Sequence, residues 1–136
     1  MNQVFYKSSQ NMSEVSECSM DLIITSPPYF NIKDYAKNGY QDLIHSHSKK
    51  GDLGAISEYK IYIQELLKVW RECERVLKPN GKICINVPLM PMFKRDLSTH
   101  YNCHIFDLQS DIQHSILEST SLFLLDLYIL ESHQYD

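Results

Sequence analysis

The chain contains the stretch Asp21-Leu22-Ile23-Ile24-Thr25-Ser26-Pro27-Pro28-Tyr29, in which an apolar run changes abruptly into a polar turn. The leucine and isoleucine side chains are typical of a buried strand over residues 21–25. Two successive prolines end that strand, because each lacks a ladder donor and has a fixed φ angle. The turn therefore lies at the carboxyl end of a strand, the edge where open α/β sheets bind ligands.

Apolar periodicity predicts the remaining elements. Residues 57–77 are expected to form a helix, with Ser57 as its N-cap. Its apolar face would consist of Tyr59, Tyr62, Ile63, Leu66, Trp70, Cys73, Val76 and Leu77. The sequence Lys78-Pro79-Asn80-Gly81 should end this helix in a turn. The other expected elements are a strand at residues 4–6, a short helix or turn at 9–15, an irregular loop at 30–55, a strand at 82–87 that Pro88 ends, a helix at 105–119 and a core strand at 122–130.

This alternation of strands and helices predicts an α/β fold, with a parallel or mixed sheet and helices on both of its faces. The chain has 136 residues, of which 43% are hydrophobic and 22% charged, as in an ordinary soluble single domain. No apolar run approaches the roughly 20 residues of a membrane span. Residues 1–7 show no signal-peptide pattern. We therefore expect a cytoplasmic protein.

The strand and turn resemble the catalytic motif of the β-class DNA amino-methyltransferases, which methylate N4 of cytosine or N6 of adenine using S-adenosylmethionine. The resemblance continues through Leu77-Lys78-Pro79-Asn80-Gly81-Lys82 and Asn86-Val87-Pro88, and fades after about residue 129. It implies a Rossmann-like, S-adenosylmethionine-dependent methyltransferase fold, present here as an incomplete doubly wound sheet.

The same resemblance assigns catalysis to Ser26, Pro27, Pro28 and Tyr29. In this assignment the Ser26 hydroxyl and the Pro27 main-chain carbonyl accept hydrogen bonds from the target amine, while Tyr29 stacks on the flipped base. No metal is required. Two structural alternatives stay open: Ser26 could cap a turn, and Tyr29 could pack in the core.

Several further residues are candidates for stacking, cofactor binding or metal binding. Phe30 and Tyr35 could stack on the base or pack in the core. Thr25 and Asn86 are candidate cofactor contacts, and a turn role suits Asn86 equally well. Cys84, His100, Cys103 and His104 could be drawn as a zinc site, but their spacing matches no common zinc motif.

Two features depart from the family pattern. The chain has four glycines and no Gly-x-Gly, although the family's cofactor turn is Phe-x-Gly-x-Gly. No target-recognition region is recognisable. Residues 1–136 are therefore interpreted as the N-terminal catalytic part of a methyltransferase domain, and a complementary C-terminal half or subunit is an expected partner.

The chain's charge bears on the other expected partner, duplex DNA. The net charge of −4 provides little for phosphate binding. A local basic patch could form only from Lys33, Lys37, Lys49 and Lys50.

The resemblance favours N4-cytosine methylation, within a restriction-modification system, because serine at the first motif position is commoner in the cytosine enzymes. N6-adenine methylation is the alternative substrate assignment. A catalytically silent fragment, or a subunit of a split enzyme, is the alternative of another class, and the missing Gly-x-Gly favours it.

Overall fold

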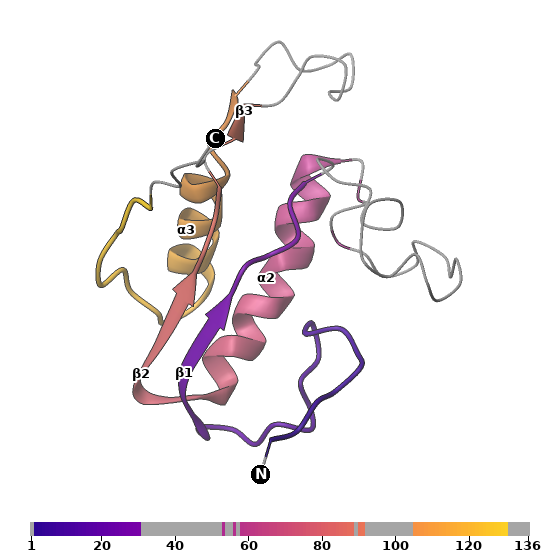
Figure 1. Ribbon diagram of the computed structural model, residues 1–136, viewed down its shortest axis with the longest axis vertical. Coiled ribbons are helices and arrows are strands. Elements are labelled where there is room, and N and C mark those ends of the chain that lie inside the picture. The colour runs from indigo at the N-terminus through magenta and orange to yellow at the C-terminus, as the bar shows by residue number, and fades with distance from the viewer. Residues whose placement is uncertain are drawn as a thin grey trace, which may run out of the picture.

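The computed structural model describes residues 2–30, 53, 56, 58–88, 90–91 and 105–130. Within these residues the elements follow in the order β1 (Met20–Thr25), α2 (Tyr59–Val76), β2 (Leu77–Ile85), β3 (Met90–Pro91), β4 (Ile105–Phe106) and α3 (Leu108–Ser119) (Figure 1). The predicted strand at 21–25 and the helices predicted at 57–77 and 105–119 are confirmed, with ends shifted by a few residues. The predicted loop at 30–55 lies almost entirely outside the described residues.

Strands β1 and β2 form a parallel pair, with Leu22 opposite Lys82 and Thr25 opposite Ile85. A crossover through α2 connects them, as parallel strands require. Strands β3 and β4 form a separate antiparallel pair. The observed α/β arrangement therefore agrees with the predicted fold class.

The predicted turn at residues 78–81 is an irregularity inside β2 rather than a connection before it. Met20 pairs with Leu77, and the next β1 partner, Leu22, pairs with Lys82, so β2 contains additional residues between the two pairings. Asn80 has a φ of 65°, a conformation that asparagine tolerates better than most residues. A Cβ at Gly81 would lie 2.9 Å from the Lys78 carbonyl oxygen, so the close backbone approach requires glycine.

The core lies between the helices and one face of the β1–β2 pair. Helix α2 contributes a continuous buried stripe that matches its predicted apolar face, and α3 adds a shorter one. The buried cluster consists of Phe30, Tyr59, Tyr62, Leu66, Val69, Trp70, Cys73, Leu108, Ile112 and Ile116. From the sheet, Ile23, Ile83 and Ile85 pack against this cluster.

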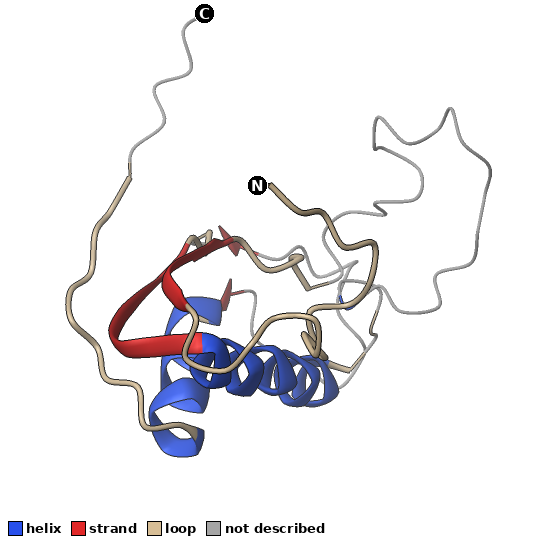
Figure 2. Ribbon diagram, turned by 90° about the horizontal axis from the view of Figure 1, so that it is seen from below, coloured by secondary structure: helices blue, strands red, loops and turns tan. Residues whose placement is uncertain are grey.

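The described helices both lie on the same side of the strands (Figure 2). On the opposite side, the alternate residues Leu22, Ile24 and Cys84 are exposed, and Ile24 is 75% exposed. The prediction of helices on both faces was therefore wrong for the part of the chain that the structure describes. A parallel sheet is ordinarily buried on both faces, and the described residues provide the covering layer for one of them.

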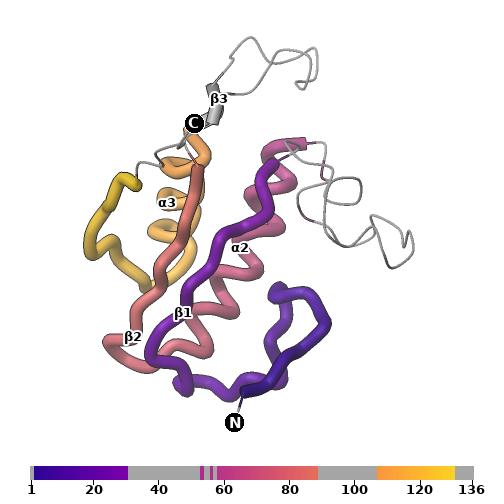
Figure 3. Tube along the Cα trace, in the orientation of Figure 1, coloured from indigo at the N-terminus to yellow at the C-terminus, as the bar shows by residue number. Residues whose placement is uncertain are grey.

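The predicted core strand at residues 122–130 was also wrong. Leu122 packs against the core, and the Ser121 N–H and hydroxyl both donate to Glu74 Oε1 at 2.6 Å. Beyond this attachment residues 123–130 are exposed and form neither helix nor strand, and they follow the outside of the molecule after α3 (Figure 3). Apolar sequence alone does not make a strand, because a strand also needs a hydrogen-bonding neighbour.

The predicted strand at residues 4–6 was wrong for the same reason. Val4, Phe5 and Tyr6 are exposed and belong to no strand. The prediction of a helix or turn over residues 9–15 resolves as turns.

Candidate active site

The candidate site is the turn Ser26–Tyr29, which begins where β1 ends. Because β1 and β2 are parallel, their carboxyl ends lie at the same edge of the sheet, and this places Asn86 beside the turn. The Asn86 N–H donates to the Thr25 carbonyl at 2.9 Å, and the Ser26 hydroxyl donates to the Asn86 carbonyl at 3.1 Å. The structure thus brings together three residues predicted for the site, Thr25, Ser26 and Asn86.

The prolines fix the middle of the turn. Pro27 is buried and Pro28 is half-buried, so the turn is packed onto the core rather than projecting from it. The Pro28 carbonyl accepts a hydrogen bond of 2.6 Å from the Tyr62 hydroxyl of α2. Ser26 remains exposed and Tyr29 is half-buried, so both can be approached from outside.

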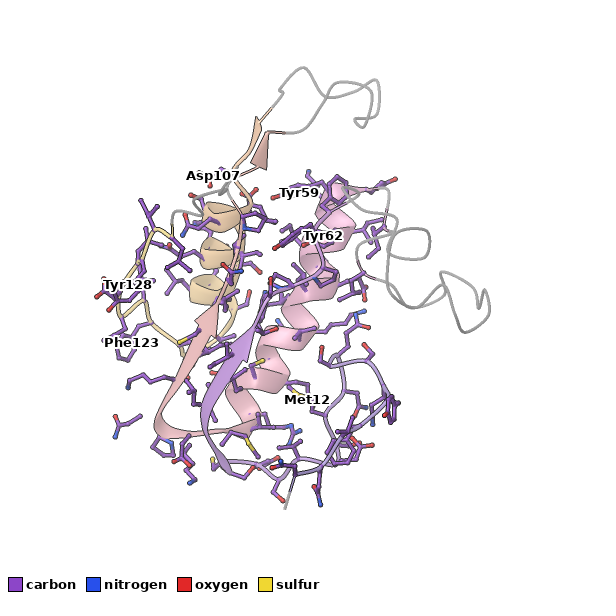
Figure 4. All side chains as sticks on the ribbon, in the orientation of Figure 1. Met12, Tyr59, Tyr62, Asp107, Phe123 and Tyr128 are labelled. Atoms are coloured by element: carbon purple, nitrogen blue, oxygen red, sulfur yellow. The ribbon has the colours of Figure 1, made fainter. Side chains whose placement is uncertain are left out.

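Phe30 follows the turn directly and is only 4% exposed. Its ring lies edge-on to Tyr59 at a centroid distance of 5.2 Å and is tilted against Tyr62 at 5.4 Å. Figure 4 shows Tyr59 and Tyr62 at the N-terminal end of α2, toward the end of the molecule where the β1–β2 pair has its carboxyl ends. In this arrangement the Phe30 ring packs in the core and is not available to stack on a base. Tyr35, the other alternative stacking residue, lies outside the described residues.

The hydroxyls of Tyr59 and Tyr62 make hydrogen bonds that the sequence analysis missed, because helical spacing marked both residues only as apolar core. The Tyr59 hydroxyl donates to Asp111 Oδ2 of α3 at 2.6 Å. Burial, followed by this bond and the Asp111 charge, raises the pKa of Tyr59 well above its ordinary value of 10.0. The phenol therefore stays protonated and joins α2 to α3. These hydrogen bonds depend on which groups lie next to each buried ring in the fold, and the sequence pattern of the helix carries no signal for them.

The described residues at this edge do not fit an S-adenosylmethionine site by themselves. The described glycine, Gly81, lies in the middle of β2, at the irregularity between its two pairings with β1. No glycine of the described segments lies at the carboxyl ends of β1 and β2, where a cofactor could approach bare backbone. Thr25 and Asn86 are thus placed at the site without a glycine cradle.

Most residues of the candidate zinc site and of the candidate basic patch lie outside the described part of the chain. No group of three or more metal-ligating side chains occurs in the part of the chain that the structure describes, and His100, Cys103 and His104 lie outside that part. Lys33, Lys37, Lys49 and Lys50 are likewise outside the described residues. Among the helices that the structure describes, none combines the length and the apolar character needed to cross a membrane.

Comparison with known proteins identifies the family of this chain. A family model described as DNA methylase, N6_N4_Mtase, matches residues 20–134. The chain belongs to this DNA methylase family. The resemblance found in the sequence is therefore confirmed.

Two relatives of this methylase chain are named Type II methyltransferases. M.MthZI of Methanothermobacter thermautotrophicus is 30% identical over 92 residues, which cover 63% of this chain and 24% of the relative. M.SmaI of Serratia marcescens is 32% identical over 75 residues, which cover 55% of this chain and 20% of the relative. The match thus extends over about a quarter or less of either relative.

A solved structure carries the same fold. TTHA0409, a putative DNA modification methylase of Thermus thermophilus, is 29% identical in its complex with S-adenosyl-L-methionine, with a TM-score of 0.52. The alignment covers 78% of this methylase chain and 34% of that structure. The small parallel sheet and its helices are therefore part of the Rossmann-like α/β fold of the S-adenosylmethionine-dependent DNA methylases.

Proposed function

We propose that residues 1–136 supply the target-base part of a DNA methyltransferase that modifies the exocyclic N4 of cytosine in duplex DNA. The observation that carries the proposal is the Ser26–Tyr29 turn, which lies at the carboxyl end of β1 and presents an exposed hydroxyl oxygen on a packed backbone. Its position at this sheet edge is the position at which open α/β sheets bind ligands.

The turn suits an exocyclic amine because it offers two acceptors. The amine nitrogen is a poor nucleophile while its lone pair is delocalised into the ring, and accepting its N–H hydrogens at fixed points favours a reactive geometry. The Ser26 hydroxyl has one hydrogen, which is donated to the Asn86 carbonyl, so its oxygen lone pairs stay available. The Pro27 carbonyl is the second proposed acceptor, held between two proline rings.

Tyr29 is the proposed stacking surface for the flipped base, since it is half-buried next to the acceptors. Phe30 is excluded from this proposal by its burial. S-Adenosylmethionine is the proposed methyl donor, with Thr25 and Asn86 as candidate contacts, and its glycine-rich binding turn is proposed to lie outside the described residues. A matched relative, TTHA0409, has been solved in complex with this compound.

N6-adenine is the alternative target, since the turn geometry would serve either amine. Serine at the first position of the motif supports cytosine, and the name Type II methyltransferase of the relatives supports a restriction-modification setting. A methylation assay that compares cytosine-only and adenine-only target duplexes separates the two substrates.

The cofactor half is proposed to come from a complementary segment or subunit. The uncovered face of the β1–β2 pair and the short span of the match both support this. By itself, the chain is expected to bind S-adenosylmethionine weakly or not at all. Titration calorimetry measures this affinity. A dissociation constant in the low micromolar range, which corresponds to a binding free energy of about −8 kcal/mol, would contradict the expectation.

Single-turnover methylation of a cytosine-containing duplex tests the roles of Ser26 and Tyr29. The enzyme is completed by joining the chain to the downstream part of a matching relative. Ser26→Ala should lower the rate about 100-fold, because a preorganised hydrogen bond is lost, and should leave DNA affinity nearly unchanged. A fully active Ser26→Ala enzyme would refute the proposed function.

Tyr29 is tested by two variants that differ only in the ring. Tyr29→Ala should weaken binding of the flipped base by about 1–3 kcal/mol as well as lowering the rate, because stacking is lost. Tyr29→Phe keeps the ring and should be nearly silent. Equal losses in both variants would remove the stacking role.

A further inference from the structure

Tyr62 of α2 contacts the Ser26–Tyr29 turn from the side of the core. Its side chain is 0% exposed, and its hydroxyl donates to the Pro28 carbonyl across 34 residues of sequence at 2.6 Å. A short hydrogen bond in a buried, low-dielectric core is strong, and leaving either partner unpaired there is costly. The contact therefore fixes the direction of the Pro28 carbonyl relative to α2.

Fixing this carbonyl fixes the rest of the turn. The proline ring sets φ of Pro28, and the bond from Tyr62 sets the orientation of the Pro28–Tyr29 peptide plane, which is rigid. On one side of Pro28 lies the Pro27 carbonyl, the proposed second acceptor. On the other side lies Tyr29, the proposed stacking ring. One hydrogen bond thus constrains both groups that are proposed to contact the base.

The opposite end of the turn is held in a different way. The Asn86 main chain accepts from the Ser26 hydroxyl and donates to the Thr25 carbonyl. These bonds come from the end of β2, whereas the Tyr62 bond comes from α2. The turn is therefore fixed to two different elements, and a change at Tyr62 should loosen one end while the Ser26 end stays in place.

We propose that Tyr62 is a positioning residue for methyl transfer, acting through the Pro28 carbonyl on the Pro27 acceptor and on Tyr29. This inference rests on the proposed function. Tyr62 does not contact the base itself. Its loss should therefore lower the rate of the chemical step and leave DNA affinity unchanged, because the acceptors remain present but less well oriented.

The chain provides a matched control in Tyr59. It belongs to the same aromatic cluster, and its hydroxyl also makes a 2.6 Å hydrogen bond, to Asp111 instead of to the turn. Tyr59→Phe and Tyr62→Phe each remove one hydroxyl, and with it the 2.6 Å hydrogen bond to Asp111 or to the Pro28 carbonyl. A purely structural role predicts similar effects of both variants on activity.

The first measurement is single-turnover methylation by the completed enzyme. Tyr62→Phe should lower the rate about tenfold at unchanged DNA affinity, and Tyr59→Phe should leave the rate within about twofold of the wild type. Equal rate losses in both variants would overturn the positioning role. A wild-type enzyme that transfers no methyl group to DNA would instead refute the proposed function.

The second measurement needs no activity. Nitrogen-15 relaxation of the Tyr29 amide reports the motion of the peptide group whose carbonyl Tyr62 holds. In the wild-type chain its order parameter should be near the rigid value of about 0.85, and in Tyr62→Phe it should fall toward about 0.6. Tyr59→Phe should leave it unchanged. An unchanged value in Tyr62→Phe would overturn the inference whatever the methylation assay shows.

Discussion

The two faces of the β1–β2 pair are both apolar and have opposite surroundings. On one face Ile23, Ile83 and Ile85 pack against the buried stripes of α2 and α3. On the other face Leu22 and Ile24 are 52% and 75% exposed. Strand alternation places large apolar residues on both sides, so the difference in their burial arises from which neighbours are present. Burial of the covered face stabilises the fold. The bare face is the surface against which we expect a further layer of structure to pack.

The largest expected effect compares the same substitution in these two environments. Leu66→Ala, at a position 1% exposed on α2, should lower the free energy of unfolding by about 3 kcal/mol, through lost burial and a cavity. Leu22→Ala on the bare face should cost about 0.5 kcal/mol. Urea denaturation of both variants measures the difference. Similar losses would mean that Leu22 is also buried in solution. Should Leu66→Ala not fold, Leu66→Met provides the milder substitution.

The thiols of Cys73 and Cys84 probe the same contrast chemically. Burial, and to a smaller extent the Glu72 charge, raises the pKa of the Cys73 thiol to about 11, whereas Cys84 is exposed on the bare face. In a chain with Cys18→Ser and Cys103→Ser, Cys84 should react with a maleimide on the order of 100-fold faster than Cys73. Mass spectrometry of the labelled peptides gives both rates. A protected Cys84 would show that the bare face is covered in solution.

A smaller effect concerns the segment before β1, which is attached to the side of the molecule formed by α2. Glu72 Oε2 accepts from the Met12 N–H at 2.6 Å, and Arg75 donates to the Met12 and Val15 carbonyls. The Arg75 hydrogen bond, and then the Met12 N–H, lower the pKa of Glu72 from 4.5 to about 2. The ionised carboxylate is thus favoured in the folded chain.

The lowered pKa of Glu72 fixes the sign of the pH dependence. The stabilisation is fully present above pH 4.5 and is lost as the pH falls through that value toward 2. Glu72→Gln should cost about 2 kcal/mol at neutral pH and flatten this acid-induced decline. Thermal unfolding between pH 2 and 7 checks the prediction. A decline as steep in Glu72→Gln as in the wild type would contradict it.

The smallest expected effect on stability comes from the bare face itself. The free energy of unfolding of the doubly substituted Leu22→Ser, Ile24→Ser chain should lie within about 1 kcal/mol of the wild-type value, about 0.5 kcal/mol for each exposed position. It should nevertheless associate less and bind less hydrophobic dye, because an exposed apolar sheet face promotes association. Analytical ultracentrifugation and dye fluorescence measure both. A monodisperse wild-type monomer with a cooperative thermal transition would contradict the idea of an incomplete sheet.

The sequence by itself determined the elements whose physical signal is local. The prolines after Thr25 ended β1, and helical spacing identified α2 together with its buried face. The motif at residues 25–29, with the Leu-Lys-Pro-x-Gly-Lys sequence downstream, was sufficient for the family. Each of these features depends on residues close together in the chain or on a fixed pattern, so a single sequence reveals them.

Tertiary structure alone decided which apolar residues are buried and what the polar groups contact. Residues 122–130 read as a core strand, yet no described neighbour pairs with them, whereas the similar run of β1 pairs with β2. The roles of Phe30 and of the Tyr62 hydroxyl likewise depend on residues brought together by the crossover of α2. Burial and hydrogen bonding are properties of pairs distant in sequence, and the apolar pattern of one segment does not specify its partner.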